Sequence, residues 1–451
     1  MEIKDLREIV DNISFLADER DVTMIRNLIV DLHPADLADI ISHLSDDHRK
    51  FIFEMLNAEI ASDVIAELDE VSKIDLVEML SESRLSEIVD EMDSDDATDL
   101  VSELPEALAE KVLKKIDIQD SAEVMELLRH EEDTAGGIMA KEFVAVNQKC
   151  NVDEAIQIIR QKSEEVDNIY YVFVVDDENI LVGIAALKDM ILAKSNTKIS
   201  QIMDRDVISV DTDLDQEEVA NIARKYDLVS IPVIDGKGKL VGRITFDDLA
   251  DVMEDEASED MQRMAGIADE EEFRETSAFR ILKVRLPWLL VGFMGQLLSA
   301  LILKNFEASM NQIIASAFFI PIIMAMGGNA GIQSSTIMVR GMATGEITIF
   351  HIGRRVLREL FVALLNGVIC GILILIVIAV WFGKVNFGII LAVAMLTVII
   401  NASMTGALVP IILRKFDVDP AIATGPFITT SNDVIGLLIY FALITVFLPW
   451  V

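Results

Sequence analysis

The sequence predicts a multi-domain protein: an all-α superhelical domain, a tandem α/β module, an acidic connecting helix and a five-helix transmembrane domain. Three patterns predict this fold class: a division of the chain by charge, a helical repeat and a duplicated strand–helix motif. Residues 279–451 contain six acids against eleven Lys and Arg, whereas residues 1–278 hold the other 70 acids and 27 bases. A strongly anionic soluble part thus precedes a hydrophobic, slightly basic part. This favours a membrane protein that handles cations.

The same composition excludes several classes. So acidic a chain would repel the phosphates of a nucleic acid, so we expect no nucleic-acid partner. The two cysteines, Cys150 and Cys370, lie in different halves, which argues against a disulfide framework and suits a reducing cytosol. The first 15 residues lack a basic stretch followed by an apolar core, so we expect no signal peptide.

The helical repeat covers residues 36–128 and has a period of 24 residues. Ile41, Ile65, Val89 and Leu113 occupy equivalent positions, and short acidic segments separate the apolar runs. This spacing predicts stacked pairs of short helices that form a superhelical domain over residues 1–130. A passive helical spacer remains an alternative to an active sensor domain.

A second pattern begins at about residue 138, where short β-branched strands alternate with amphipathic helices. The motif at residues 170–189 recurs 59 residues later, so that Val174 matches Val233 and Gly183 matches Gly242. Such a duplication resembles a tandem pair of CBS domains, at 138–199 and 200–256. The resemblance implies a regulatory module that often binds adenosine nucleotides or metals.

Nucleotide-binding CBS domains often end in an element whose hydroxyl and carboxylate contact ribose. The second copy offers Thr245 and Asp248 for these roles, whereas the first has Ala186 where Thr245 stands. Binding of ATP or another adenosine nucleotide therefore stays open. The alternative is that Asp248 only caps the helix that it begins.

An acidic connecting helix is expected at residues 257–278. Around its start, carboxylates recur every three or four residues and so share a face of a helix. Their repulsion would be relieved by hydrated divalent cations, and oxygen ligands without Cys or His fit Mg²⁺ or Ca²⁺ far better than zinc or copper. A solvated acidic linker is the alternative. These carboxylates are Asp248, Asp251, Asp255, Glu259 and Asp260.

Five apolar stretches follow residue 285, and each approaches or exceeds the ~20 residues that cross a bilayer as a helix. Most of the arginines and lysines outside them lie before the first stretch and in the second and fourth connections. The positive-inside rule then places the N-terminal half in the cytoplasm and the C-terminus outside a plasma or inner membrane. The five stretches are 286–303, 313–338, 361–382, 387–413 and 421–450.

Asp433 is the one acid within these stretches, near the middle of the fifth. Burying its charge costs at least ~2.5 kcal/mol, so it should face protein, water or a cation. Thr429 and Thr430 add oxygens nearby, and residues 327–333 of the second stretch bring glycines and amides to the same depth. The alternative for these glycines is close helix packing. A two-fold dimer axis through a pore would supply a second carboxylate.

At this point the order of parts resembles the MgtE family of magnesium channels. The most specific pieces are PIIMAMGGNAGIQSST at 321–336 and DPAIATGPFITTSNDV at 419–434. The resemblance implies a homodimer whose pore is lined by the second and fifth spans. Asp433 would hold a hydrated Mg²⁺ ion, and Asn329, Gly328, Thr429 and Thr430 are the pore-lining candidates.

The resemblance also implies regulation, because in this family cytoplasmic Mg²⁺ bridges the helical domain, the CBS domains and the connecting helix, and thereby closes the pore. Two rivals stay open: an ion-coupled secondary transporter of divalent cations, and a CBS-based nucleotide sensor with a membrane anchor. No nucleophile–base pair or phosphate-binding loop predicts an enzyme. The regulatory acids implied by the resemblance are Asp63, Asp95, Asp99, Asp248, Asp251, Glu256, Glu259 and Asp260.

Overall fold

The structure is a computed structural model, and its contacts divide the chain into two compact units, Met1–Met253 and Glu254–Val451. Each unit is described by itself. Residues 268–277 of the predicted connecting helix lie outside the described residues. The described residues are 3–163, 166, 168–267, 278–307, 314–344, 347, 352–416, 418–423 and 425–450.

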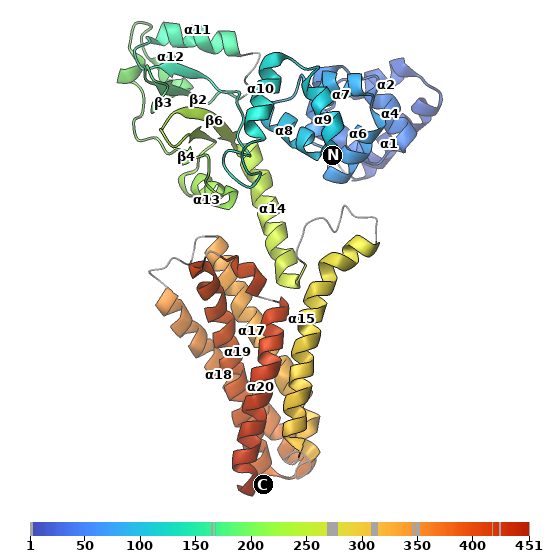
Figure 1. The fold of residues 1–451 in the computed structure, drawn as a ribbon, viewed down its shortest axis with the longest axis vertical. Helices are drawn as coiled ribbons and strands as arrows, with labels where there is room; N and C mark the ends of the chain where they lie inside the picture. Colours follow the sequence, from blue (N-terminus) through green and yellow to red (C-terminus); the bar gives the residue numbers. More distant parts are fainter. Residues whose placement is uncertain are drawn as a thin grey trace. The chain divides into compact units, whose positions relative to one another are not determined.

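The first unit begins with stacked short helices, as the 24-residue repeat predicts (Figure 1). Helices two apart in sequence pack on each other, as α3 does on α5 and α5 on α7, and their buried apolar faces form one continuous core. The helices are α1 Ile3–Asp18, α2 Val22–Ile29, α3 Pro34–Ser42, α4 Asp46–Phe53, α5 Ala58–Ala66, α6 Glu70–Met79, α7 Glu82–Val89, α8 Ser94–Glu103, α9 Glu106–Leu113 and α10 Ile118–Leu127.

The short polar segments between these helices act as caps. The side chains of Asn57 and Asp69 accept hydrogen bonds from backbone N–H groups in the first turns of α5 and α6. Ser81 does the same at the start of α7. Each cap satisfies a donor that the helix itself leaves unpaired, which explains why the breaks of the repeat are rich in Asp, Asn and Ser.

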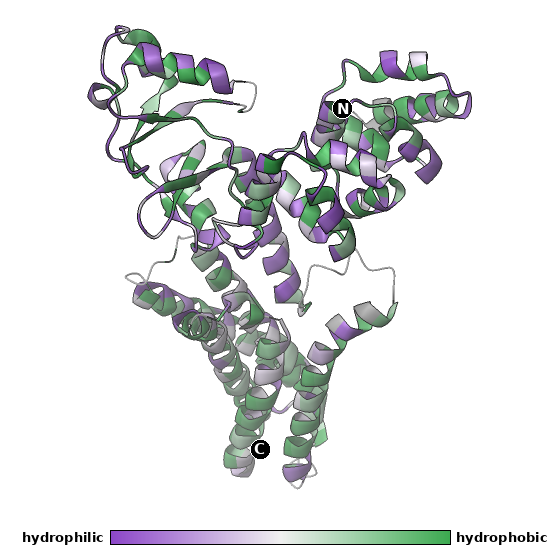
Figure 2. Ribbon diagram, turned by 45° about the horizontal axis from the view of Figure 1, so that its top comes forward, coloured by the Kyte–Doolittle hydropathy of each residue, from purple (hydrophilic) through white to green (hydrophobic). Residues whose placement is uncertain are grey.

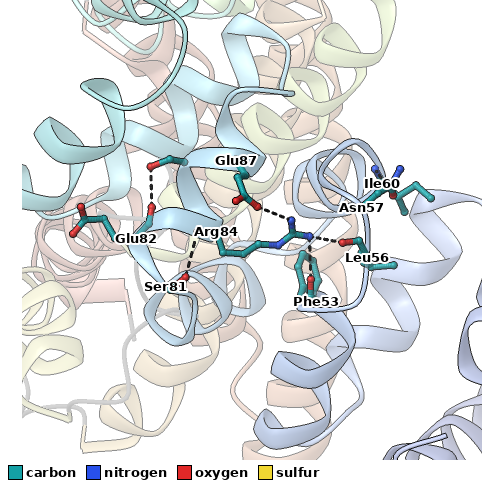
Figure 3. A network of polar contacts seen from close by, with 9 residues as sticks. Phe53, Leu56, Asn57, Ile60, Ser81, Glu82, Arg84 and Glu87 are labelled. Carbon is teal, nitrogen blue, oxygen red and sulfur yellow. Dashed lines mark hydrogen bonds and ion pairs between the residues drawn. The ribbon is translucent and has the colours of Figure 1, made fainter. Parts of the chain in front are cut away.

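Arg84 joins successive repeats of this helical stack (Figure 3). From α7 its Nη2 donates to the carbonyl oxygens of Phe53 and Leu56, at 3.2 and 2.5 Å, where α4 ends. Its Nη1 lies 3.2 Å from a carboxylate oxygen of Glu87. The guanidinium thus supplies donors to carbonyls that have no partner within their own helix.

The duplicated module folds into two three-stranded sheets with orders β1-β2-β3 and β4-β5-β6. In each sheet the first pair is parallel and the second antiparallel. The elements are β1 Ala145–Asn147, α11 Val152–Lys162, β2 Tyr171–Val175, β3 Leu181–Ala186, α12 Leu187–Leu192, β4 Val210–Asp211, α13 Gln216–Tyr226, β5 Ser230–Ile234, β6 Leu240–Thr245 and α14 Phe246–Ala265.

The two sheets share the same register, so the sequence duplication is a structural one. Val174 pairs with Gly183 in the first sheet, and Val233 pairs with Gly242 in the second. A Cβ on Gly183 would lie 2.8 Å from the carbonyl oxygen of Asp204, and one on Gly242 would be similarly crowded. Both copies therefore need glycine where another segment crosses the sheet.

The second unit contains five helices that are long and apolar enough to cross a membrane, among the residues that the structure describes. These helices are predominantly hydrophobic along their length, as Figure 2 shows. Their elements are α15 Ala278–Asn305, α17 Ile320–Ala343, preceded by a 3₁₀ turn at Ile314–Phe319, α18 Ile352–Phe382, α19 Val385–Lys415, and α20 Gly425–Phe447, which follows a 3₁₀ turn at Pro420–Ala423.

The third span corrects the sequence prediction. The apolar stretch was placed at 361–382, but α18 begins at Ile352 and the whole helix qualifies as a span. Glu359 therefore lies inside it and is buried, with the hydroxyl of Ser334 donating to its carboxylate at 2.7 Å. The candidate span of the structure thus contains a second acid besides Asp433, whereas the apolar stretch predicted at 361–382 contains none.

Candidate cation sites

The first candidate site gathers carboxylates within the first unit. Asp95, Asp96 and Asp99 lie in the first turns of α8, and the charge of Asp248, in the first turn of α14, acts on all three. Three carboxylates of the helical domain therefore meet one from the second copy of the α/β module. The structure thus brings together Asp95, Asp99 and Asp248, which the family resemblance had grouped.

Desolvation, and after it repulsion between carboxylates, raises the pKa values of this acidic cluster. Loss of contact with water and, next, the nearby Asp248 carboxylate together raise the pKa of Asp96 to about 7, while Lys73 acts in the opposite sense. Desolvation likewise raises the pKa of Asp99 to about 6, although its side chain still reaches solvent and Lys73 acts in the opposite sense. The pKa of Asp95 is raised well above its ordinary value, by desolvation first and by Asp248 next.

Glu142 extends the cluster and anchors it to the start of α8. Its carboxylate accepts hydrogen bonds from the Ser94 backbone N–H at 3.2 Å and from the Ser94 hydroxyl at 2.8 Å. The same hydroxyl accepts from the backbone N–H of Lys141 at 2.8 Å. Desolvation raises the pKa of Glu142 as well. Ser94 thus holds α8 against the segment that leads into the first sheet.

The donor set of this cluster consists of carboxylate and hydroxyl oxygens, which suits Mg²⁺. Among the described residues, no group of three acidic, His or Cys side chains is close enough to form a direct metal cage. Mg²⁺ dehydrates reluctantly and usually keeps several waters, so a hydrated ion needs no such cage. The residues present therefore fit a hydrated Mg²⁺ ion better than a directly ligated one.

Two other predicted regulatory acids lie at the surface of the first unit. Asp63 is exposed on α5. The strongest charges acting on Asp95 come from Asp248, Asp96, Glu142 and Asp93, not from Asp63. Asp251 is exposed on α14, one turn after Asp248. The cluster around Asp248 is thus formed chiefly by α8.

The predicted nucleotide contacts, Thr245 and Asp248, are bonded to each other. The Thr245 hydroxyl donates to the Asp248 carboxylate at 2.5 Å, and the Thr245 backbone N–H donates to the same oxygen at 3.0 Å. Asp248 is the third residue of α14, so its carboxylate reaches back to the residue before the helix, as in one half of a capping box. A pocket between the sheets, lined by Tyr170, Ser230 and Arg243 among others, has a volume of only about 10 Å³.

The second unit holds the other half of α14, with Glu256, Glu259 and Asp260. Arg263 pairs with Glu259 one turn earlier, and its Nη1 lies 2.6 Å from a carboxylate oxygen of Asp419. Asp419 also caps the 3₁₀ turn ahead of α20, where it accepts from the Ala421 N–H at 2.8 Å. Desolvation first, and then the charges of Asp419 and Glu256, raise the pKa of Asp260 to about 6, while Arg263 acts in the opposite sense.

The intramembrane acid predicted from sequence contacts a neighbouring helix. Asp433 on α20 accepts a hydrogen bond from the side-chain amide of Gln296 on α15 at 2.5 Å. The carboxylate remains partly exposed within the single chain. Gly295 allows this approach, because a Cβ there would overlap the methyl group of Thr430. Asp433 is therefore held by an amide donor and still accessible.

A cavity of about 740 Å³ lies beside this pair, between the end of α14, α15 and the start of α20. Gln296, Thr429 and Thr430 line it. The Thr429 hydroxyl donates to the carbonyl oxygens of Gly425 and Pro426, both at 3.1 Å. The two threonines predicted as pore-lining thus face open space in the second unit.

The two remaining pore-lining candidates differ in their exposure. Asn329 is exposed on α17, whereas Gly328 is buried against α20. There the side-chain amide of Asn432 donates to the carbonyl oxygen of Met324 at 3.1 Å. A Cβ on Gly327 would meet Asn432 and Val398. The glycines of this segment therefore serve close packing within the chain, while Asn329 faces outward.

Sequence reasoning missed several members of these sites. Asp96 carried a signal, because it stands beside Asp95 in an acidic run. Gln296 carried a weaker one, as an amide in the middle of an apolar stretch. Arg263, Asp419 and Glu142 gave none, because their roles depend on contacts between distant segments.

Family models match most of the chain. A divalent cation transporter model, MgtE, matches residues 320–443, and the MgtE intracellular N domain matches 32–133. CBS domains match 135–196 and 199–255.

Related proteins point to the same family as these models. The magnesium transporter MgtE of Enterococcus faecalis is 38% identical over 328 residues, covering 73% of this chain and 72% of that protein. MgtE of Thermus thermophilus is 36% identical over 320 residues, which is 71% of either chain. MgtE of Bacillus subtilis is 37% identical over 325 residues, covering 72% of either chain.

Two solved structures resemble the soluble part. One is the soluble part of a magnesium transporter, with 31% identity and a TM-score of 0.52 over 56% of this chain and 99% of that one. The other is the cytosolic domain of the Mg²⁺ channel MgtE in complex with ATP, with 34% identity and a TM-score of 0.52 over 54% of this chain and 99% of that one. Family models thus match the helical domain, the tandem CBS domains and the helices from α17 to α20, and the chain belongs to the MgtE family of magnesium transporters.

Proposed function

We propose that this chain is a magnesium-selective channel that mediates Mg²⁺ uptake and closes when cytoplasmic Mg²⁺ binds to its acidic sites. The observation that carries the proposal is the convergence of Asp95, Asp96 and Asp99 on Asp248, with pKa values raised by desolvation and mutual repulsion. Such a cluster is costly without a counter-ion. A cation that binds it stabilises this arrangement over one in which the carboxylates separate.

The acids of α14 extend this argument. Asp260 and Asp419 repel each other in the second unit, where Arg263 already neutralises part of their charge. Mg²⁺ bound to Glu256, Glu259 or Asp260 would compensate the remainder. Several weak sites that favour the same state would make closure steep in Mg²⁺ concentration.

For conduction, we propose that Asp433 holds a Mg²⁺ ion in transit through retained waters. The accessible carboxylate and the adjoining cavity support this role.

We further propose a homodimer, with α17 at its interface. One stripe of α17 is exposed in the single chain and includes the amides of Asn329 and Gln333. Polar groups on the surface of a membrane helix are stable against a partner or a water-filled pore. The N-terminal half would lie in the cytoplasm, given the basic connections.

An adenosine nucleotide is the second ligand that we propose for the soluble part. The support is the related cytosolic domain in complex with ATP. In this chain the Thr245–Asp248 hydrogen bond would have to open for both groups to contact a ribose. Isothermal titration of ATP against the wild type and Thr245→Ala, with and without Mg²⁺, tests this.

Flux into liposomes tests conduction. Wild-type protein should pass Mg²⁺ along its gradient without a proton gradient, and Asp433→Asn should reduce flux at least about tenfold, because the ion loses its charge partner. Strict dependence on protons would favour a coupled transporter instead. Unchanged flux in Asp433→Asn would contradict the role proposed for Asp433, and absence of Mg²⁺ flux through the wild type would favour a membrane anchor.

Limited proteolysis of the full chain tests gating. Cleavage of the soluble part should slow as Mg²⁺ rises, and the triple variant Asp95→Asn/Asp99→Asn/Asp248→Asn should lose this protection. The matched control removes three exposed acids at α1, Glu8→Gln/Asp11→Asn/Glu19→Gln, and should retain it. Equal loss in both variants would mean that protection reflects only general charge screening.

A further inference from the structure

A basic pocket lies at the facing ends of α17 and α18. Its volume is about 490 Å³, and among the residues that the structure describes seven line it, four of them arginines. Arg340 belongs to the last turn of α17, and the other three arginines to the first turns of α18. The lining residues are Ile337, Arg340, Gly341, Ile347, Arg354, Arg355 and Arg358.

These arginines face one another without acidic partners among the described residues. Glu359 follows Arg355 by one helical turn, but its buried carboxylate accepts from Ser334 on α17 and appears in no ion pair of the described residues. The Nε of Arg355 is buried and has no hydrogen-bond partner there. A pocket with this much like charge and an unused donor is suited to an anion.

The chemistry of the pocket indicates which class of anion it would bind. Guanidinium groups bind phosphate through paired N–H donors, which a single chloride ion cannot use. Basic pockets at the ends of membrane helices match the headgroups of anionic lipids. Exposed apolar side chains occur near the pocket: Ile337 lines it, and Leu357 and Phe361 lie one and three residues from Arg358 on α18. An acyl chain could follow them, whereas free phosphate would gain nothing from them.

We propose that this four-arginine pocket binds the phosphate of an anionic phospholipid headgroup. The bound headgroup would offset the repulsion between Arg340 and the arginines of α18, and would so hold the ends of the two helices together. The Ser334–Glu359 hydrogen bond joins the same helices next to the pocket. The inference does not depend on Mg²⁺ conduction.

Native mass spectrometry of the delipidated full-length protein in detergent tests the proposal. Wild type should retain phosphatidylglycerol in preference to phosphatidylcholine. The variant Arg354→Gln/Arg355→Gln/Arg358→Gln should retain at least about tenfold less phosphatidylglycerol, since each basic group contributes to the attraction of an anionic headgroup. The matched control Lys283→Gln/Lys304→Gln/Lys415→Gln removes three exposed charges outside the pocket and should bind within twofold of wild type.

Three results would overturn the proposal: equal loss in the control, equal retention of both lipids by wild type, or displacement of phosphatidylglycerol by millimolar inorganic phosphate. The last would identify the pocket as a site for free phosphate. If the triple variant fails to fold, the single variant Arg355→Lys decides. It keeps the charge but loses the fork of donors, so phosphatidylglycerol retention should still fall, and unchanged retention would count against the pocket.

Discussion

The guanidinium of Arg263 on α14 lies 2.6 Å from the carboxylate of Asp419, 156 residues further along the chain, in the segment that precedes α20. The same guanidinium pairs with Glu259 on its own helix. Arg263 therefore ties the end of α14 to the entrance of the helix that carries Asp433. Within the second unit this is a direct connection between the proposed sensor and the proposed conduit.

Replacement of Arg263 by Gln should weaken closure. The Arg263–Asp419 pair exists in the described state, so its loss should raise the Mg²⁺ concentration for half-maximal inhibition of flux by about two- to fivefold, as expected for a partly exposed ion pair. Liposome flux at varied internal Mg²⁺ measures this. The control Arg205→Gln removes an exposed arginine elsewhere and should leave inhibition unchanged.

A double-mutant cycle separates the pair from its surroundings. Asp419→Asn should cause a similar shift, and Arg263→Gln/Asp419→Asn should shift inhibition no further than either single variant. Additive shifts would show that the two residues act independently.

Gln296 should tune the affinity of the intramembrane site. Its amide donates to the Asp433 carboxylate and so competes with any cation for that oxygen. Gln296→Leu should lower the Mg²⁺ concentration for half-saturation of flux by about tenfold, because a hydrogen bond to a charged group is lost. Maximal flux should fall as the ion leaves more slowly.

The control for Gln296 is Thr397→Val. The Thr397 hydroxyl donates to the Val393 carbonyl oxygen within the same helix, so its removal makes a span less polar without affecting Asp433. A rise in the half-saturating concentration in Gln296→Leu would mean that the amide supports the ion rather than competing with it.

Much of the fold was predictable because its signals are local or repeated. The 24-residue period predicts helix pairs from apolar spacing alone, and the 59-residue duplication is confirmed by equivalent pairs such as Val174 with Gly183. The start of α18 was not predictable from the sequence, because the apolar run begins at residue 361 while the helix begins at Ile352. An arginine-rich first turn has the propensity to be helical without being hydrophobic.

The site residues likewise divide into those that the sequence could predict and those that it could not. Asp95 and Asp248 could be grouped from the family resemblance, and Asp433 from its depth in an apolar stretch. The partners Gln296 and Asp419 could not be found, because the packing of distant segments decides which side chains meet them. Spacing along the chain carries no information about such contacts.

Arg84 should be important for the stability of the helical domain. Its side chain is largely buried and donates to two carbonyl oxygens at the end of α4. Arg84→Ala should lower the free energy of unfolding by about 1–3 kcal/mol, since those carbonyls lose a charged donor. Chemical denaturation of the full chain measures this change. The control is Lys114→Ala, whose ion pair with Glu110 is exposed and whose loss should lower the free energy of unfolding by less than about 1 kcal/mol.

The acidic cluster should make the metal-free protein less stable as the pH rises. The pKa of Asp96 is about 7 and that of Asp99 about 6 in the folded chain, against an ordinary value of 3.8. Between about pH 4 and pH 7 the folded state therefore binds more protons than the unfolded state. The stability contributed by these groups is fully present below pH 4, falls through this window and levels off above it.

Mg²⁺ should oppose this fall, because the cation replaces the lost protons as the counter-charge. Thermal melting in chelator should show a melting temperature that declines from pH 5 to pH 8, whereas saturating Mg²⁺ should remove most of the decline. Asp96→Asn should raise the metal-free melting temperature at pH 8 by roughly 2–4 °C and lessen its pH dependence. A wild-type decline that Asp96→Asn and Asp99→Asn leave intact would place its origin outside the cluster.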